Sequence, residues 1–116
     1  MNTIKVKELV DNGLSETSGL ILRKKIQELL NNSTKKIILD FSGITLFATP
    51  FFNSFIGYFV LQYSPERVDE LIEITNISDL GKETYNHSYS NAKNIYNKKI
   101  DTEEIGEIVK SNIENK

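Results

Sequence analysis

The feature that most constrains the fold is an uncharged stretch, residues 41–65, which lies between Asp40 and Glu66. It is long enough to cross a membrane if it formed one helix. Polar residues, glycines and a Thr-Pro pair interrupt it, however, and its first part has the composition of a strand and a turn. We therefore expect this stretch to form the core of a water-soluble domain and predict no membrane span.

Strand-like and helix-like segments alternate along the chain. The patterns predict a strand over 3–10, a helix over 16–31, a strand over 35–41, a helix over 50–63, a short helical piece over 64–70, a strand over 70–77 and a helix over 79–98. This order implies parallel neighbouring strands joined by right-handed crossovers. The expected fold is a small α/β layer fold, β-α-β-α-β-α, with a mostly parallel sheet of three or four strands.

Local signals place some of these elements more closely. Ser15 and Ser78 are the expected N-caps of the helices over 16–31 and 79–98. The first of these helices has an apolar stripe that includes Leu22 and Ile26, and its polar residues, Arg23 among them, are expected to face outward. The run over 35–41 is apolar at successive positions, which predicts a central strand covered on both faces.

The last segment predicts a separate amphipathic helix. Asp101 and Glu104 have the spacing of a capping box. Apolar residues follow at helical spacing, namely Ile105, Ile108, Val109 and Ile113. We expect one domain over 1–99 and a C-terminal helical extension over 100–116.

The composition of the chain argues against several kinds of functional site. The chain has 116 residues, enough for one domain, and no cysteine, so disulfides and thiolate sites are excluded. A net charge of −2 provides no cationic field for nucleic acid. The N-terminus lacks a signal-peptide pattern, and we expect a cytoplasmic location. His87, the only histidine, lacks a suitable set of co-ligands, and no nucleophile and base can be paired. We expect neither an enzyme nor a bound cofactor or metal.

The helix over 50–63 is apolar over more of its circumference than one core contact requires. Two adjacent stripes consist of Phe51, Phe55 and Phe59, and of Phe52, Ile56 and Val60. Either neighbouring elements cover both stripes, which we expect, or one of them meets another protein. A second aromatic stripe runs along the helix over 79–98 and is expected to be core with hydroxyls at the rim. It consists of Tyr85, Tyr89, Ala92 and Tyr96.

Three short motifs carry a family resemblance. They are "SETSGLILR" at 15–23, "LDFSGI" at 39–44 and "FFNSF" at 51–55. In this order and spacing they resemble the STAS-like family of unknown function found in many bacteria, related to the STAS domains of sulfate transporters and anti-sigma-factor antagonists. The resemblance covers roughly residues 3–98. It implies a non-catalytic regulatory domain that docks a protein partner, an ATPase of the histidine-kinase-like anti-sigma type being the partner expected by analogy.

The start of the aromatic helix is where the resemblance places the site. In antagonist-type STAS domains a serine there is phosphorylated, but here that position falls on Pro50 and the neighbouring hydroxyl belongs to Thr49. Thr49 is expected foremost as an N-cap, with Pro50 at the first helical position, and it is also the candidate phosphoacceptor. The predicted partner site consists of small and weakly polar residues: Thr49, Pro50, Asn53, Ser54 and Gly57.

Two other classes of function stay open at this point. The aromatic helix and the tyrosine stripe are of a kind that can line a pocket for a nucleotide or a lipid, which would make the domain a small-molecule sensor. The last amphipathic helix can instead assemble a structural homo-oligomer, so a homodimer is also considered.

Overall fold

The computed structural model describes residues 2–32 and 35–114, and it describes the surroundings of side chains in this part of the chain up to residue 99. The elements in order are β1 (Asn2–Lys5), α1 (Val6–Leu9), α2 (Glu16–Asn31), β2 (Ile37–Asp40), α3 (Thr49–Phe52), the π-helix η1 (Asn53–Gly57), α4 (Tyr58–Gln62), α5 (Pro65–Leu71), β3 (Ile72–Thr75) and α6 (Asp79–Glu114). The expected α/β class and the order of its main elements are confirmed.

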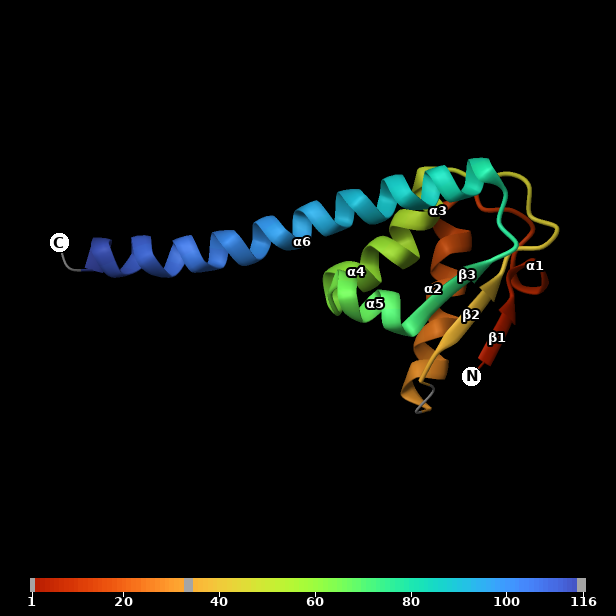
Figure 1. Ribbon diagram of the computed structural model, residues 1–116, viewed down its shortest axis with the longest axis horizontal. Helices are drawn as coiled ribbons and strands as arrows, with labels where there is room; N and C mark the ends of the chain where they lie inside the picture. Colours follow the sequence, from red (N-terminus) through yellow and green to blue (C-terminus); the bar gives the residue numbers. More distant parts are fainter. Residues whose placement is uncertain (1, 33–34, 115–116) are drawn as a thin grey trace.

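The described residues form one three-stranded sheet, in which both pairs of neighbours are parallel and β2 is central. Helices α2 and α4 lie on the same side of this sheet (Figure 1), as expected when successive crossovers have the same hand. The prediction that the central strand is covered on both faces is wrong. Ile37 and Leu39 are fully buried, but Ile38 and Asp40 between them are only half-buried.

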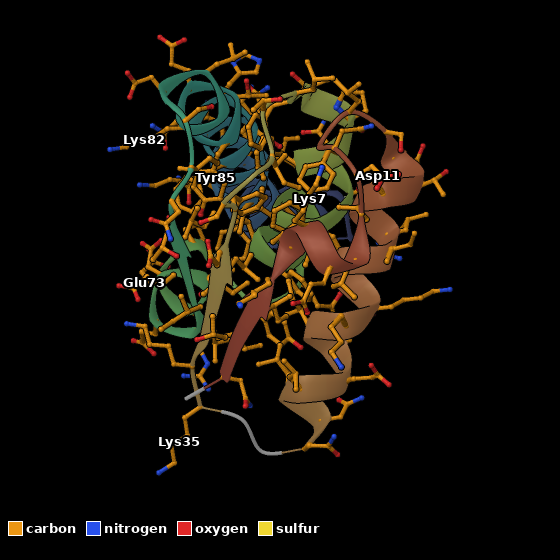
Figure 2. The ribbon with its side chains drawn as sticks, turned by 90° about the vertical axis from the view of Figure 1, so that its right-hand side faces the viewer. Lys7, Asp11, Lys35, Glu73, Lys82 and Tyr85 are labelled. Atoms are coloured by element: carbon orange, nitrogen blue, oxygen red, sulfur yellow. The ribbon has the colours of Figure 1, made fainter. Side chains whose placement is uncertain are left out.

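The second face of the sheet carries polar side chains. Figure 2 shows Glu73 of β3 pointing away from the helices, and its side chain is exposed. The short apolar run was therefore misleading here, because Ile38 lies on a half-buried face of the sheet between Thr3 and Glu73. A sheet with one open face needs apolar residues on only one side of each strand.

The first predicted strand is shorter than its alternating pattern. It ends at Lys5, and the backbone then forms the single helical turn α1, closed by a hydrogen bond from Val10 N to Val6 O of 3.0 Å. Ile4, Val6 and Val10 are all buried. The spacing from Val6 to Val10 fits a helical turn, and the alternation of Ile4 with Val6 fits a strand, so the sequence satisfies both patterns in succession.

The aromatic helix forms the centre of the core. All six phenylalanines of the chain are buried, and those at 51, 55 and 59 pack beside Phe52, Ile56 and Val60. Helix α2 packs on one side of η1 and α6 packs on the other. Both apolar stripes are therefore covered by neighbouring elements, which confirms that they are core. The single helix predicted over 50–63 is instead interrupted by the π-helical turn η1.

Helix α6 begins as predicted and ends differently. The Ser78 hydroxyl accepts a hydrogen bond from Gly81 N at 3.1 Å, as an N-cap should. The helix then runs without a break to Glu114, so the separate helix starting at Asp101 is not formed and Asp101 is not a cap. The apolar residues predicted beyond residue 99 lie outside the part of the chain whose side-chain surroundings are described. Within the described residues, every helix is too short or too polar to span a bilayer.

Candidate functional site

A groove of about 870 Å³ lies between α2 and α6, and its floor is formed by the aromatic helix. We call it the α2–α6 groove. Helix α2 contributes Glu16, Leu20 and Arg23, the central helix contributes Pro50, Asn53, Ser54, Gly57, Tyr58 and Leu61, and α6 contributes Ser88, Asn91, Ala92, Asn94, Ile95 and Lys98. The volume falls in the range of about 300–1,000 Å³ that is usual for binding pockets.

Four of the five predicted partner-site residues line this groove. They are Pro50, Asn53, Ser54 and Gly57. Thr49 is the exception, since it is half-buried and is not part of the lining. The structure therefore brings together residues that had been grouped only by their place on one helix.

Thr49 is not the N-cap of the aromatic helix. The helix begins at Thr49 itself and Ala48 occupies the capping position, with no side-chain hydrogen bond. Backbone pairing fixes this start instead, because Gly13 N donates to Leu46 O and Ala48 N donates to Gly13 O, both at 2.8 Å. A parallel β-bridge between Gly13 and Phe47 thus fixes the backbone directly before the helix. No capping side chain is required.

The floor of the groove coincides with the π-helical turn. Asn53 begins this turn, and its Oδ1 accepts a hydrogen bond from the Ser88 hydroxyl of α6. The Ser54 hydroxyl donates to Phe51 O at 2.8 Å, which occupies it within its own helix. Gly57 ends the turn and is buried. Single π-helical turns often occur at functional sites, and this one joins the central helix to α6 at the floor of the groove.

Gly57 in the floor has room for a Cβ. A Cβ added there would have its nearest neighbours at 3.9 Å, the backbone oxygen of Phe52 and the Ser88 hydroxyl. These are ordinary contacts, and the backbone dihedral angles of Gly57 are helical. The fold therefore tolerates a larger residue at this position, and glycine keeps the groove deeper than packing demands.

Arg23 is a half-buried cation in the wall of the groove. Its guanidinium lies 4.0 Å from the centre of the Tyr58 ring, and Nη1 donates to Ser54 O over 3.4 Å. The Nε atom is buried and has no hydrogen-bond partner. Among the side chains that the structure describes, no carboxylate pairs with Arg23. The prediction that Arg23 faces outward is therefore wrong, because its guanidinium packs on Tyr58 and its Nε is buried.

The rim of the groove is apolar on the side where α4 faces α6. Leu61 is 39% exposed and Ile95 is 54% exposed. Lys98 of α6 is exposed beside them. The groove lining thus combines two cations, one carboxylate from Glu16 and several amides with exposed leucine and isoleucine, which is the mixed polar and apolar chemistry of a surface for a polypeptide.

Comparison with known proteins identifies the family. Residues 18–82, more than half of the chain, match the model of the family described as STAS-like domain of unknown function (DUF4325). The chain belongs to this family. Neither the curated proteins nor the solved structures that were compared with it gave a match. The expected resemblance is confirmed, and the matched segment extends from the first turn of α2 to the first turn of α6.

The "SGL" part of the first motif has a packing role in this STAS-like domain. Gly19 lies where α2 crosses the central helix, and a Cβ there would approach the Ser54 hydroxyl to 1.7 Å and Phe51 O to 2.4 Å. Only glycine allows the two helices to come this close. Ser15, as predicted, caps α2 by accepting a hydrogen bond from Ser18 N at 3.0 Å.

The "LDFSG" motif of the STAS-like domain builds the turn after the central strand. Asp40 accepts hydrogen bonds from the Ser42 hydroxyl at 2.6 Å, Ser42 N at 2.9 Å and Asn76 Nδ2 at 3.0 Å. The bonds from Ser42, then the one from Asn76, lower the pKa of Asp40 from its ordinary value of 3.8 to about 2. Gly43 has a φ of 84°, which favours glycine. This motif lies at the end of the sheet and is not part of the groove lining.

The tyrosine stripe packs against the core, and its three tyrosines are not part of the groove lining, whereas its Ala92 is. The ring of Tyr85 meets that of Phe52 edge-on at 5.8 Å, and the Tyr89 hydroxyl donates to Asp69 Oδ2 at 3.1 Å. Burial is the main cause that raises the pKa of Tyr89 to about 12. These contacts confirm the predicted core with hydroxyls at the rim. His87 is exposed beside Asn91, and the described residues contain no cluster of metal ligands.

Sequence reasoning missed the two walls of the groove. Arg23 and Ser88 were not predicted as site residues, and neither was Ile95. Ile95 follows Ala92 by three residues and so adjoins the edge of the tyrosine stripe, and an isoleucine at the margin of that stripe was the available signal.

Proposed function

We propose that this STAS-like domain is a non-catalytic, regulatory protein-interaction domain that binds a protein partner in the α2–α6 groove. The observation that carries the proposal is the convergence of Pro50, Asn53, Ser54 and Gly57 on one groove, at the position where the family resemblance places the regulatory site. The exposed Leu61 and Ile95 on its rim support a polypeptide occupant.

By resemblance, the partner class that we propose is a histidine-kinase-like ATPase of the anti-sigma type. Phosphorylation of Thr49 stays a prediction. Thr49 is half-buried as the first residue of α3, so a kinase would require some opening of the chain there. The proposed docking does not depend on that modification.

Photo-crosslinking from defined positions tests the proposal. A photoreactive residue replaces Leu61 or Ile95 on the groove rim, and in a matched control it replaces Leu80, which is 56% exposed and lies outside the groove lining. In cells that make this protein, we expect the photoreactive residues at positions 61 and 95 to crosslink to the same second protein. The photoreactive residue at position 80 should not crosslink to that protein. Identical products from all three positions, or no second protein from the groove, would contradict the proposal.

A small-molecule sensor is the second candidate, and one observation favours it. The groove volume is that of a ligand pocket, and Arg23 and Lys98 are suited to an anionic group. The aromatic residues that first suggested this class are largely in the core, however, with Tyr58 as the aromatic residue of the groove lining. A thermal-shift panel of nucleotides and fatty acids checks this alternative, which fails if none raises the unfolding midpoint.

A further inference from the structure

The α2–α6 groove follows the central helix for about three turns. Its floor reaches from Pro50 to Leu61, and these two residues are about 16 Å apart along a helix. In each of the three helices the lining positions recur at helical spacing, as in Glu16, Leu20 and Arg23 of α2. One face of each helix therefore borders the groove over several turns.

The two charges of the α2 wall are separated along the groove. Gly19 lies against Ser54, and Arg23, one turn later, lies over the ring of Tyr58. Helix α2 therefore runs in the same direction as the central helix. Glu16, one turn before Gly19, borders the beginning of the groove. It is about 10 Å from Arg23 along the helix axis, and the two form no ion pair in the part of the chain that the structure describes.

The α6 wall places its cation at the other end of the groove. Gly81 lies against Phe47, and the Ser88 hydroxyl, two turns later, donates to Asn53 Oδ1. Helix α6 therefore also runs in the direction of the central helix. Lys98 is about 15 Å beyond Ser88 along α6. Along the groove the order of charges is thus a carboxylate, a guanidinium and an ammonium group.

The surfaces between these charges are apolar or small. Leu61 and Ile95 are 39% and 54% exposed on the rim, and Leu20 is half-buried in the α2 wall. On the floor, the Ser54 hydroxyl is bonded within its own helix and Gly57 has no side chain. Small residues on the floor allow another helix to approach to the usual interaxial distance of about 8–10 Å.

A helix suits this groove better than an extended segment does. The walls and the floor are themselves helices, whose backbone groups are bonded internally, so they offer no sheet edge. The N–H and C=O groups of an extended segment would largely lack partners there. A helix bonds its own backbone and presents only side chains. Three turns of helix match the length of the floor.

We propose that the part of the partner protein that occupies the α2–α6 groove is an amphipathic helix with a defined order of charges, an inference that rests on the proposed function. A basic side chain lies opposite Glu16, and acidic side chains lie opposite Arg23 and Lys98. Apolar side chains between them contact Leu61 and Ile95. Arg23 thereby gains a carboxylate partner, and its contact with an aromatic ring holds the guanidinium in place for that pairing.

Photo-crosslinking from the two ends of the floor tests the helix. A photoreactive residue replaces Pro50 in one variant and Leu61 in another, and mass spectrometry identifies the crosslinked residues of the partner. Points about 16 Å apart are about 11 residues apart on a helix and about five on an extended segment. We expect the helical spacing within one segment.

The outcomes separate this inference from the proposed function. A spacing of about five residues, or crosslinks to two separate segments, would overturn the helix and leave the partner site standing. The absence of any crosslinked second protein would refute the proposed function, and this inference with it.

Charge reversal tests the order of charges. Arg23→Glu and Glu16→Lys should each lower the yield of the partner crosslinked from position 61 at least about tenfold, because like charges then meet. Lys24→Glu, at an exposed position of α2 outside the groove lining, makes the same change of charge as Arg23→Glu and should leave the yield unchanged. An equal loss with Lys24→Glu, or undiminished yields with both groove variants, would overturn the charge order.

A conservative pair of variants keeps the test valid if circular dichroism shows that Arg23→Glu is unfolded. Arg23→Lys keeps the positive charge and should retain the crosslink. Arg23→Gln removes the charge and should lower the yield at least about tenfold relative to Arg23→Lys. Equal yields from these two variants would overturn the pairing of Arg23 with an acid of the partner.

Discussion

At the scale of single residues, Asp40 shows how a motif of this family acts through structure. Its carboxylate joins the end of β2 to the loop after β3, through Ser42 on one side and Asn76 on the other. Three hydrogen-bond donors favour the charged form, which is why the pKa is low. The side chain orients the turn that leads to the aromatic helix, although it lies outside the groove.

Asp40 predicts a specific acid sensitivity. Because the folded-state pKa of about 2 is below the ordinary 3.8, the stability contributed by this carboxylate is complete above pH 3.8 and is lost as the pH falls towards 2. Asp40→Asn should therefore lower stability at neutral pH and reduce the further loss between pH 4 and 2. Urea unfolding at several pH values measures both effects. The exposed Glu73→Gln serves as control, and an unchanged acid dependence in Asp40→Asn would refute this role.

The contact of Arg23 with Tyr58 could not be predicted from the sequence. In the pattern of α2 it lies beside the apolar stripe, where a solvated cation is usual. Its position over Tyr58 depends on a residue of another helix, 35 positions later in the chain. A pattern within one helix cannot predict such a contact. The burial of Leu22 and Ile26, which does follow from that pattern, was predicted correctly.

At the scale of elements, two glycines in helices differ in how closely the neighbouring helix approaches them. Gly19 is required by the close crossing of α2 over the central helix, whereas a Cβ at Gly57 would make only ordinary contacts. The sequence contains both in helical surroundings and does not distinguish them. Their roles become different only when the neighbouring helix is in place.

This contrast gives a paired stability prediction. Gly19→Ala should lower the free energy of unfolding by about 1–3 kcal/mol, the usual cost of overpacking. Gly57→Ala should raise it by about 0.5–1 kcal/mol, because alanine favours helix over glycine and its Cβ meets no close contact. Denaturant unfolding of both variants measures the difference. A Gly57→Ala variant that is less stable than Gly19→Ala would contradict the packing described for the groove.

Element boundaries were predicted best where a local signal fixes them. Ser15 and Ser78 mark helix starts by their own hydrogen bonds, and these starts were correct. The start of the aromatic helix is fixed by the distant pairing of Gly13 with Phe47, so Thr49 was wrongly predicted as its cap. The π-helical turn and the continuity of α6 through Asp101 also lacked a local sequence signal.

At the scale of the whole molecule, the domain buries its aromatic helix between α2 and α6 and leaves a groove above the same helix. The class of fold follows from the order of apolar segments, since parallel strands with helical crossovers have few alternative arrangements. The groove does not follow from that order. It depends on where α6 crosses the body, which is set by contacts such as Asn53 with Ser88 and Phe52 with Tyr85.

The central claim is that the groove binds a protein partner, and Asn53→Arg tests it most directly. Asn53 is exposed and lies in the groove lining, so a long cation there blocks the floor. Ser90→Arg on the exposed surface of α6, outside the groove lining, is the matched control. The measurement is the amount of the groove-crosslinked protein recovered with each variant. We predict at least about a tenfold lower recovery with Asn53→Arg, as for disruption of an interface centre, and unchanged recovery with Ser90→Arg. Equal recovery by both variants would contradict the claim.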